Sequence, residues 1–98
     1  MATIKCLVTY PALLISNIGE FEINYKEAKV TIEDDGNLNA LREDVVVFAS
    51  LHVFGILYGP QNAICNMDVY VDDVKVNSEP VKSVFKESGI QLFNWSAS

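Results

Sequence analysis

The side chains in this sequence that are best suited to catalysis or metal binding are a single histidine, His52, and two cysteines, Cys6 and Cys65. A histidine can act as the base for a cysteine nucleophile when a carboxylate orients the imidazole. The three residues are widely spaced, however, and His52 lies inside an apolar run, where a histidine is more commonly hydrogen-bonded to backbone. We therefore expect a structural histidine and no catalytic residue.

Metal and cofactor sites are also not indicated. A zinc site usually takes four nitrogen or sulfur ligands, and one histidine with two isolated cysteines cannot readily supply them. The stretch "DDGNLNALREDV" places Asn37 at position 4 and Asp44 at position 11, which is the wrong register for a calcium loop. The glycines form neither a dinucleotide-binding motif nor a phosphate-binding loop. We expect no metal and no cofactor.

Acidic residues gather in short segments that read as turns, and four of them are candidate contacts for a partner: Asp34, Asp35, Asp72 and Asp73. The simpler interpretation is that they serve as turn and cap residues. The alternative is an acidic patch that binds a basic partner or imitates a row of nucleic-acid phosphates. If the second interpretation holds, these four aspartates form the surface through which the protein binds its partner.

Length and composition restrict the class of protein. The 98 residues suit one domain over residues 1–98, and thirteen acidic against seven basic residues give a net charge of -6. This balance argues against direct binding to nucleic acid or to anionic lipid, which both favour a basic surface. Two cysteines and a poor signal-peptide pattern predict free thiols and a cytoplasmic location.

Local patterns predict several strands. "TIKCLVTY" alternates as a strand does, and "IQLFNW" reads as a last strand. "FEINYKEAKVTIE" predicts a hairpin with its loop at Lys26–Glu27, which would place six apolar side chains on one face. "MDVYVDDVKVN" predicts a second hairpin, with Val71 opposite Val74 across a loop at Asp72–Asp73.

The most apolar segment is "DVVVFASLHVFGILYG", residues 44–59. It is too short for a membrane helix, which needs about 20 apolar residues. Its valines favour a strand, but a strand of this length would be unusual, and Gly59-Pro60 resembles a helix stop. We expect a helix over about 38–58, apolar on most of its circumference. One sheet cannot cover such a helix, so we also expect a homo-oligomer.

A short helix is expected in "PVKSVFKES", after Pro80 and before Gly89. The predicted fold is α+β: a mixed or antiparallel sheet with one long and one short helix. From Ala28 onward the order β-α-β-β-α-β suggests a ferredoxin-like core, with an extra N-terminal strand or hairpin.

Three functional hypotheses follow from these observations. The leading one is a small acidic intracellular protein that works by binding, as an accessory factor or an inhibitor of a basic or nucleic-acid-binding protein, of the kind found in phages and mobile elements. The alternative is a homo-oligomer that binds or sequesters a nucleotide or metabolite in a pocket between subunits. The third, an enzyme that uses His52 or a cysteine, has the least support.

Overall fold

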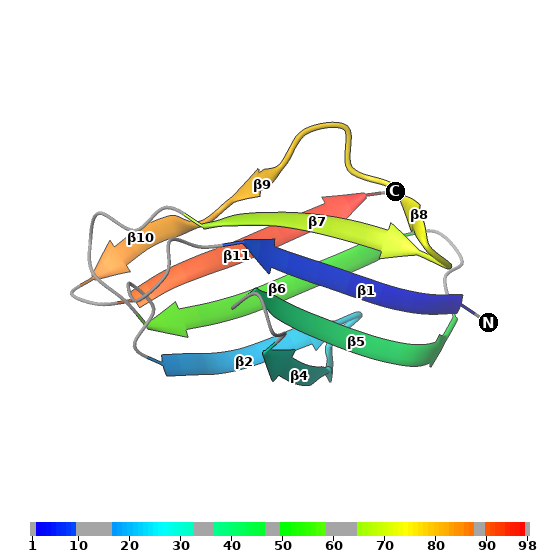
Figure 1. Cartoon of the computed structure of the whole chain (residues 1–98), viewed down its shortest axis with the longest axis horizontal. Coiled ribbons are helices and arrows are strands. Elements are labelled where there is room, and N and C mark those ends of the chain that lie inside the picture. Colours follow the sequence, from blue (N-terminus) through cyan, green and yellow to red (C-terminus); the bar gives the residue numbers. More distant parts are fainter. Residues whose placement is uncertain are drawn as a thin grey trace.

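The computed structural model of the chain describes residues 2–9, 17–32, 37–46, 50–58, 65–87 and 90–97. Within these ranges every regular element is a β-strand, and the strands form two antiparallel sheets that pack face to face (Figure 1). The predicted α+β class is therefore wrong, and so is the ferredoxin-like core, because both depend on helices that these residues do not form.

Sheet A is built around β1 (Ala2–Thr9), which pairs with β5 (Leu38–Val45) on one side and with β7 (Asn66–Val71) on the other. Its outer strands are β4 (Lys29–Ile32), which pairs with β5, and β8 (Val74–Lys75) and β9 (Val81–Lys82), which both pair with β7.

Sheet B is built around β6 (Leu51–Tyr58), which lies between β2 (Asn17–Ile23) and β11 (Ile90–Ala97). Its outer strands are β3 (Lys26–Glu27), paired with β2, and β10 (Val84–Glu87), paired with β11.

Two corners join the sheets. β3 and β4 follow each other around Ala28, and β9 and β10 follow each other around Ser83, so each of these segments begins in one sheet and ends in the other. Backbone hydrogen bonds hold both corners: Ala28 N donates to Phe21 O over 2.8 Å, and Ser83 N donates to Cys65 O over 2.9 Å. Strands that switch sheets in this way make the corners of a closed sandwich.

The predicted helix over 38–58 is wrong, because the apolar run is divided between the two sheets. Val45 ends β5 in sheet A, and Leu51 begins β6 in sheet B. In β6 the side chains of Leu51, Val53 and Leu57 are buried between the sheets, while the intervening ones lie on the outer face. Among the described residues of the run, the two strands thus bury Val45, Leu51, Val53 and Leu57 between the sheets and leave the alternate residues of β6 on the outer face. A homo-oligomer was expected because it would cover an apolar helix, and without that helix this segment gives no reason to expect one.

The predicted short helix in "PVKSVFKES" is also wrong, since its described residues form β9 and β10. Pro80, taken as the start of the helix, precedes a strand just as well, and Val81 and Val84 suit a strand better than a helix; the predicted end at Gly89 lies outside the described residues. The other terminal predictions are confirmed: β1 buries Ile4, Cys6 and Val8, and β11 covers the predicted last strand.

One of the two predicted hairpins is confirmed and the other is displaced. In the second, Val71 pairs with Val74 and Tyr70 with Lys75 across the Asp72–Asp73 turn, as predicted. In the first, the turn is at Asn24–Tyr25, two residues before the predicted loop, so that Ile23 pairs with Lys26. Asparagine adopts a positive φ more readily than lysine or glutamate does, which favours the observed turn.

The displaced turn also changes the predicted apolar face. Phe21, Ile23 and Ala28 are buried, but Tyr25 and Ile32 are exposed, so the six apolar side chains do not share one face. Ile32 belongs to β4, which has already crossed into sheet A.

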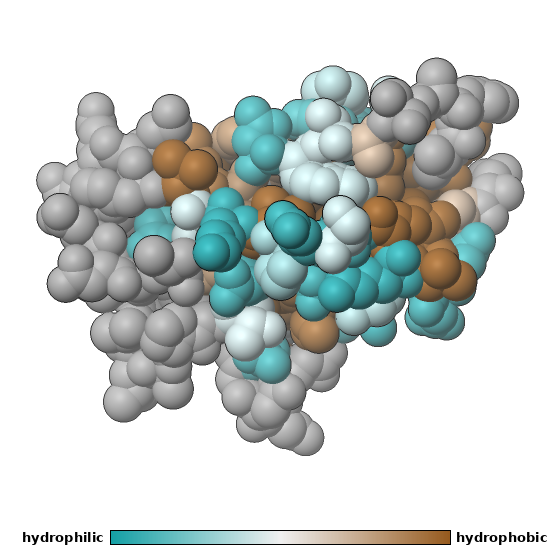
Figure 2. Space-filling view, turned by 90° about the horizontal axis from the view of Figure 1, so that it is seen from above, coloured by the Kyte–Doolittle hydropathy of each residue, from teal (hydrophilic) through white to brown (hydrophobic). Residues whose placement is uncertain are grey.

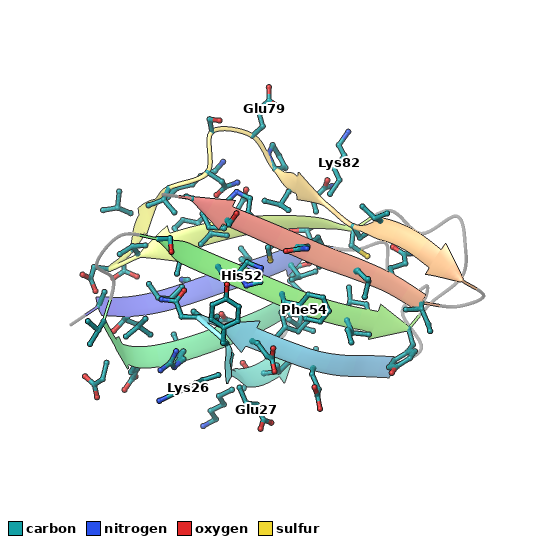
Figure 3. The ribbon with its side chains drawn as sticks, turned by 180° about the vertical axis from the view of Figure 1, so that it is seen from behind. Lys26, Glu27, His52, Phe54, Glu79 and Lys82 are labelled. Carbon is teal, nitrogen blue, oxygen red and sulfur yellow. The ribbon has the colours of Figure 1, made fainter. Side chains whose placement is uncertain are left out.

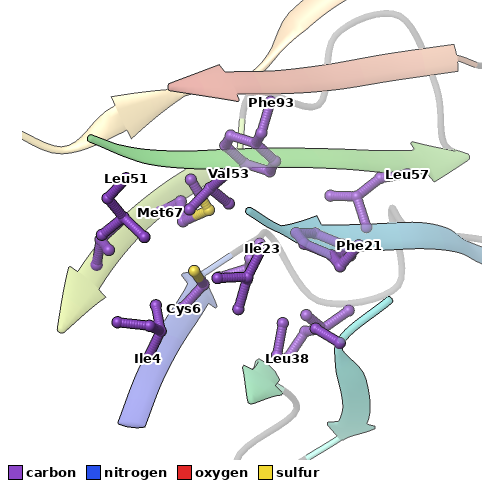
Figure 4. Close-up of a cluster of buried hydrophobic side chains, with 14 of the residues drawn as sticks. Ile4, Cys6, Phe21, Ile23, Leu38, Leu51, Val53, Leu57, Met67 and Phe93 are labelled. Carbon is purple, nitrogen blue, oxygen red and sulfur yellow. The ribbon is translucent and has the colours of Figure 1, made fainter. Parts of the chain in front are cut away.

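The core lies between the sheets (Figure 4). Its centre is a row in which Phe21, Gly55 and Phe93 are paired residues of β2, β6 and β11. The two phenylalanine rings lie 6.3 Å apart between centroids, and a Cβ added to Gly55 would come within 2.3 Å of the Phe21 ring. Glycine is required here because the Phe21 ring occupies the space of a side chain at residue 55.

Candidate functional site

The outer face of sheet B carries the most unusual group of side chains among the described residues. Figure 3, which views this sheet from its outer side, shows His52 and Phe54 along β6 and Glu27 at one edge of the sheet; Lys82, which belongs to β9 of sheet A, lies on the opposite side of the view. The central row runs across four strands through Glu27, Glu22, Phe54 and Asn94, each paired with the next. We call the group formed by Glu22, Glu27, Tyr25, His52 and Phe54 the acidic-aromatic face.

Tyr25 sits at a backbone position that disfavours it. Asn24 and Tyr25 form the two-residue turn between β2 and β3, with φ values of 50° and 67°. Such a turn prefers glycine at its second position, and a left-handed conformation costs a residue with a Cβ about 1 kcal/mol. The Tyr25 side chain is nevertheless 76% exposed. An exposed aromatic residue kept at a strained position contributes little to folding, and strain of this kind often marks a functional site.

His52 holds the Tyr25 ring in place. The two rings are stacked, with centroids 4.9 Å apart and planes inclined by 12°. The turn is fixed to β6 by two hydrogen bonds, from Asn24 N to His52 O and from His52 N to Asn24 Oδ1, both 2.8 Å long. The strained turn therefore presents a rigid aromatic surface.

The imidazole of His52 has one polar contact on this face. Its Nε2 lies 2.9 Å from Asn94 Oδ1. Because an amide oxygen only accepts hydrogen bonds, Nε2 donates in this contact. Nδ1 is buried and has no hydrogen-bond partner. The ring thus supports Tyr25, and in the described part of the chain no carboxylate is hydrogen-bonded to it that could orient it as a base.

Two carboxylates face each other beside the aromatic residues. Glu22 and Glu27 are directly paired across β2 and β3, an arrangement of like charges that destabilises a sheet by up to about 1 kcal/mol. In the described part of the chain, no lysine or arginine forms an ion pair with either carboxylate. Glu22 is also paired with Phe54 of β6. The face therefore combines uncompensated negative charge with an aromatic ring.

An apolar row continues the same face toward β10. Ile56, Leu92 and Val84 are paired across β6, β11 and β10, and Val84 is 56% exposed. An open hollow of about 220 Å³ lies beside them, lined by Lys82, Val84, Leu92 and Asn94. The row adds apolar area to the side of the face that lies away from the carboxylates.

Exposed apolar side chains also occur elsewhere. Val74 and Val76 of the β8 region are largely exposed, and Figure 2 shows apolar surface toward the end of the molecule where β8 lies, with polar side chains over the middle. This second area has neither a strained aromatic residue nor paired carboxylates among its described residues, so it has fewer groups that could bind a partner specifically.

The four acidic residues singled out from the sequence do not belong to the acidic-aromatic face. Asp34 and Asp35 lie outside the described residues. Asp72 and Asp73 form the β7–β8 turn, with φ values of 48° and 68°. The Asp72 carboxylate accepts a hydrogen bond of 2.9 Å from Thr3 N and so fastens the turn to β1. A role for Asp72 and Asp73 in binding a partner stays a prediction.

The structure does not bring His52 and the cysteines together. Both thiols are buried, with Cys6 between the sheets, whereas His52 lies on the outer side of sheet B. Burial raises the pKa of the Cys6 thiol to about 12. Burial also raises the pKa of Cys65, partly offset by its hydrogen bond with Ser83. Both thiols therefore stay protonated near neutral pH, where they are poor nucleophiles.

In the described ranges, no three histidine, cysteine or acidic side chains are grouped closely enough to hold a metal ion. Nor does any described segment form a helix with the length and apolar character that a membrane crossing requires.

The chain matches no protein-family model, and comparison with curated proteins and with solved structures gave no match either. The function must therefore be argued from the surface itself. The acidic-aromatic face could not be recognised from the sequence while the first turn was predicted at Lys26–Glu27. A turn at Asn24–Tyr25 would have paired Glu22 with Glu27 and exposed Tyr25, and Asn24 was the residue that could have indicated it.

Proposed function

We propose that this chain is a non-catalytic binding protein whose acidic-aromatic face takes up a basic, partly apolar surface of a protein partner. The observation that carries the proposal is Tyr25, an exposed aromatic side chain held at a strained turn and stacked on His52. Tyrosine is enriched among the residues that dominate binding energy at protein interfaces.

The charges around Tyr25 support a basic partner. A lysine or arginine that lies between Glu22 and Glu27 would neutralise two carboxylates that now repel each other, and its aliphatic stem would cover Phe54. The net charge of -6 also attracts a basic partner once the two surfaces approach within the screening length, about 8 Å at physiological ionic strength. A partner held in this way would have its basic surface blocked from nucleic acid, which is the inhibitory role expected from composition.

The geometry favours this function over the small-molecule alternative. The hollow beside Val84 and Leu92 has a volume of about 220 Å³. Pockets for drug-sized ligands usually span about 300–1,000 Å³ and enclose most of the ligand. An open face that is spread over β2, β3 and β6 suits a protein surface better.

The test is affinity capture with three variants from cells that produce the protein. Tyr25→Gly removes the aromatic ring and relieves the backbone strain, and Glu22→Lys with Glu27→Lys reverses the paired charges. Glu79→Lys, on the β8–β9 connection at another edge of the molecule, is the control for charge alone (Figure 3).

We expect the wild type and Glu79→Lys to retain the same protein, and the other two variants to lose it. Retention of that protein by Tyr25→Gly and by the Glu22/Glu27 variant alike would refute the proposed site. Asp73→Lys, added as a fourth variant, tests separately whether the β7–β8 turn contributes.

A further inference from the structure

The opposite side of the sandwich carries a surface whose charge complements the acidic-aromatic face. Five residues form a continuous row across the outer face of sheet A, each paired with the next: Lys29, Leu41, Lys5, Tyr70 and Lys75. We call them the lysine row. It crosses β4, β5, β1, β7 and β8, the strands nearest the viewer in Figure 1.

The lysine row gathers positive charge that is scarce in this chain. It holds three of the seven lysine and arginine residues. Lys75 forms an ion pair of 3.5 Å with Asp68, and the Lys5 ammonium lies 5.3 Å from the centre of the Tyr70 ring. Lys29 is exposed and, in the described part of the chain, has no ion pair. Leu41 and Tyr70 separate the lysines, so the row is both basic and apolar.

The two surfaces also agree in size. Neighbouring strands lie about 4.8 Å apart, so the lysine row spans about 19 Å and the row from Glu27 to Asn94 about 14 Å. Lys29 and Lys5 lie two strands apart, about 10 Å, which lets one of them approach the Glu22 and Glu27 carboxylates while Leu41 covers Phe54. Sheets that pack face to face are separated by about 10 Å, a gap that opposed lysine and glutamate side chains can bridge.

We infer that the lysine row of one copy docks on the acidic-aromatic face of a second copy, so that the chain associates with itself head to tail. The inference rests on the proposed function, since it names sheet A of another copy as one basic, partly apolar surface that the face accepts. The two surfaces lie on opposite sides of the sandwich, so every copy can contact two neighbours. Such a contact closes into a ring or continues as a filament.

The net charge of each copy does not prevent this contact. Two copies of charge -6 repel each other, but at physiological ionic strength charges are screened beyond about 8 Å. The charges that meet at the contact therefore decide whether it forms: on one side Lys5, Lys29 and Lys75, the last already paired with Asp68, and on the other the two glutamates. A second copy that approaches with its own acidic-aromatic face would meet like charge, which disfavours a symmetric dimer through that face.

Charge reversal on each surface tests the contact. The first variant carries Lys5→Glu and Lys29→Glu, the second carries Glu22→Lys and Glu27→Lys, and the third carries all four changes. Sedimentation velocity over a concentration series up to about 1 mM measures association, and a thermal melt of each variant checks that it is folded.

The wild type should sediment faster as its concentration rises, beyond the value for a dimer. The first and second variants alone should remain monomers. Their equimolar mixture, and the third variant alone, should associate again because opposite charges then face each other. A wild type that stays monomeric, or association that survives both single-surface reversals, would overturn the inference.

The outcome for self-association is separable from that for the partner. The first variant keeps the acidic-aromatic face intact, so it should still capture the partner while it remains a monomer. If the wild type is a monomer but captures the partner, only the self-association is refuted. If the wild type associates and the Tyr25→Gly variant captures the same proteins as the wild type, only the proposed function is refuted.

Discussion

Replacing Gly55 with alanine tests how the core of the sandwich is packed. The alanine Cβ would lie 2.3 Å from Phe21 Cε1 and 2.7 Å from two further ring atoms, well inside van der Waals contact. Phe21 is buried and packs on Phe93, so its ring cannot move away without disturbing the core. Overpacking of this kind costs about 1–3 kcal/mol.

A smaller effect opposes that cost. Alanine in a strand interior is more favourable than glycine by about 0.5–1 kcal/mol, which leaves a net loss of about 1–2 kcal/mol for Gly55→Ala. For a domain of this size the melting temperature should fall by roughly 5–15 °C. Urea denaturation with a circular dichroism signal measures the free energy of unfolding directly.

A second substitution identifies the cause. Phe21→Leu removes the ring atoms that the new Cβ would strike, at a cost of its own from lost packing. The double variant should be more stable than the sum of the two single effects predicts, by about 1 kcal/mol or more. Two results would contradict this reasoning: a Gly55→Ala variant with the melting temperature of the wild type, or a double variant whose loss of stability equals the sum of the two single losses. In either case the close approach of Phe21 to residue 55 is not what requires glycine.

Three other outcomes are expected. Asn77→Ala should lower the stability by about 2 kcal/mol in urea denaturation, because the buried N–H of Val69 loses its acceptor, Asn77 Oδ1, at 2.8 Å; a loss under about 0.5 kcal/mol would contradict this. Burial raises the pKa of Cys6 from 9.0 to about 12, so between these pH values only the unfolded chain releases the thiol proton, and the contribution of this thiol to the free energy of unfolding, complete below pH 9, falls as the pH rises toward 12. Cys6→Ala should make this alkaline fall in stability shallower; curves of stability against pH that are parallel for the variant and the wild type would exclude the explanation. Tyr25→Gly should melt no lower than the wild type, because relief of the turn offsets the lost ring stack, and a clear destabilisation would show that Tyr25 serves the fold.

The sequence was a good guide where polar and apolar residues alternate. Strands β1 and β11 and the β7–β8 hairpin were predicted correctly because one side of each faces the core and the other faces solvent. Strand β6 was mistaken for helix because its outer positions are also apolar: Phe54 and Ile56 hide the period of two that Leu51, Val53 and Leu57 would otherwise show. These outer residues belong to the proposed binding surface or border it, so the feature that misled the prediction is part of the candidate site.

The displaced first hairpin has a similar origin. The loop was predicted at Lys26–Glu27 because that register places six apolar side chains on one face, whereas tyrosine is a poor residue for the second position of the tight turn that actually forms. Only the contacts of the folded chain, the ring stack on His52 and the two hydrogen bonds of Asn24, show why the turn forms there. Local preference could not reveal an arrangement that depends on a strand 28 residues away in the sequence.

The corners at Ala28 and Ser83 have a consequence for recognition. Because each corner segment is hydrogen-bonded in both sheets, neither sheet can separate or shear without breaking bonds in the other. The side chains of the outer surfaces are thus anchored on a stiff scaffold before any encounter. Binding then forfeits little conformational entropy, and a modest number of contacts can suffice for a useful affinity.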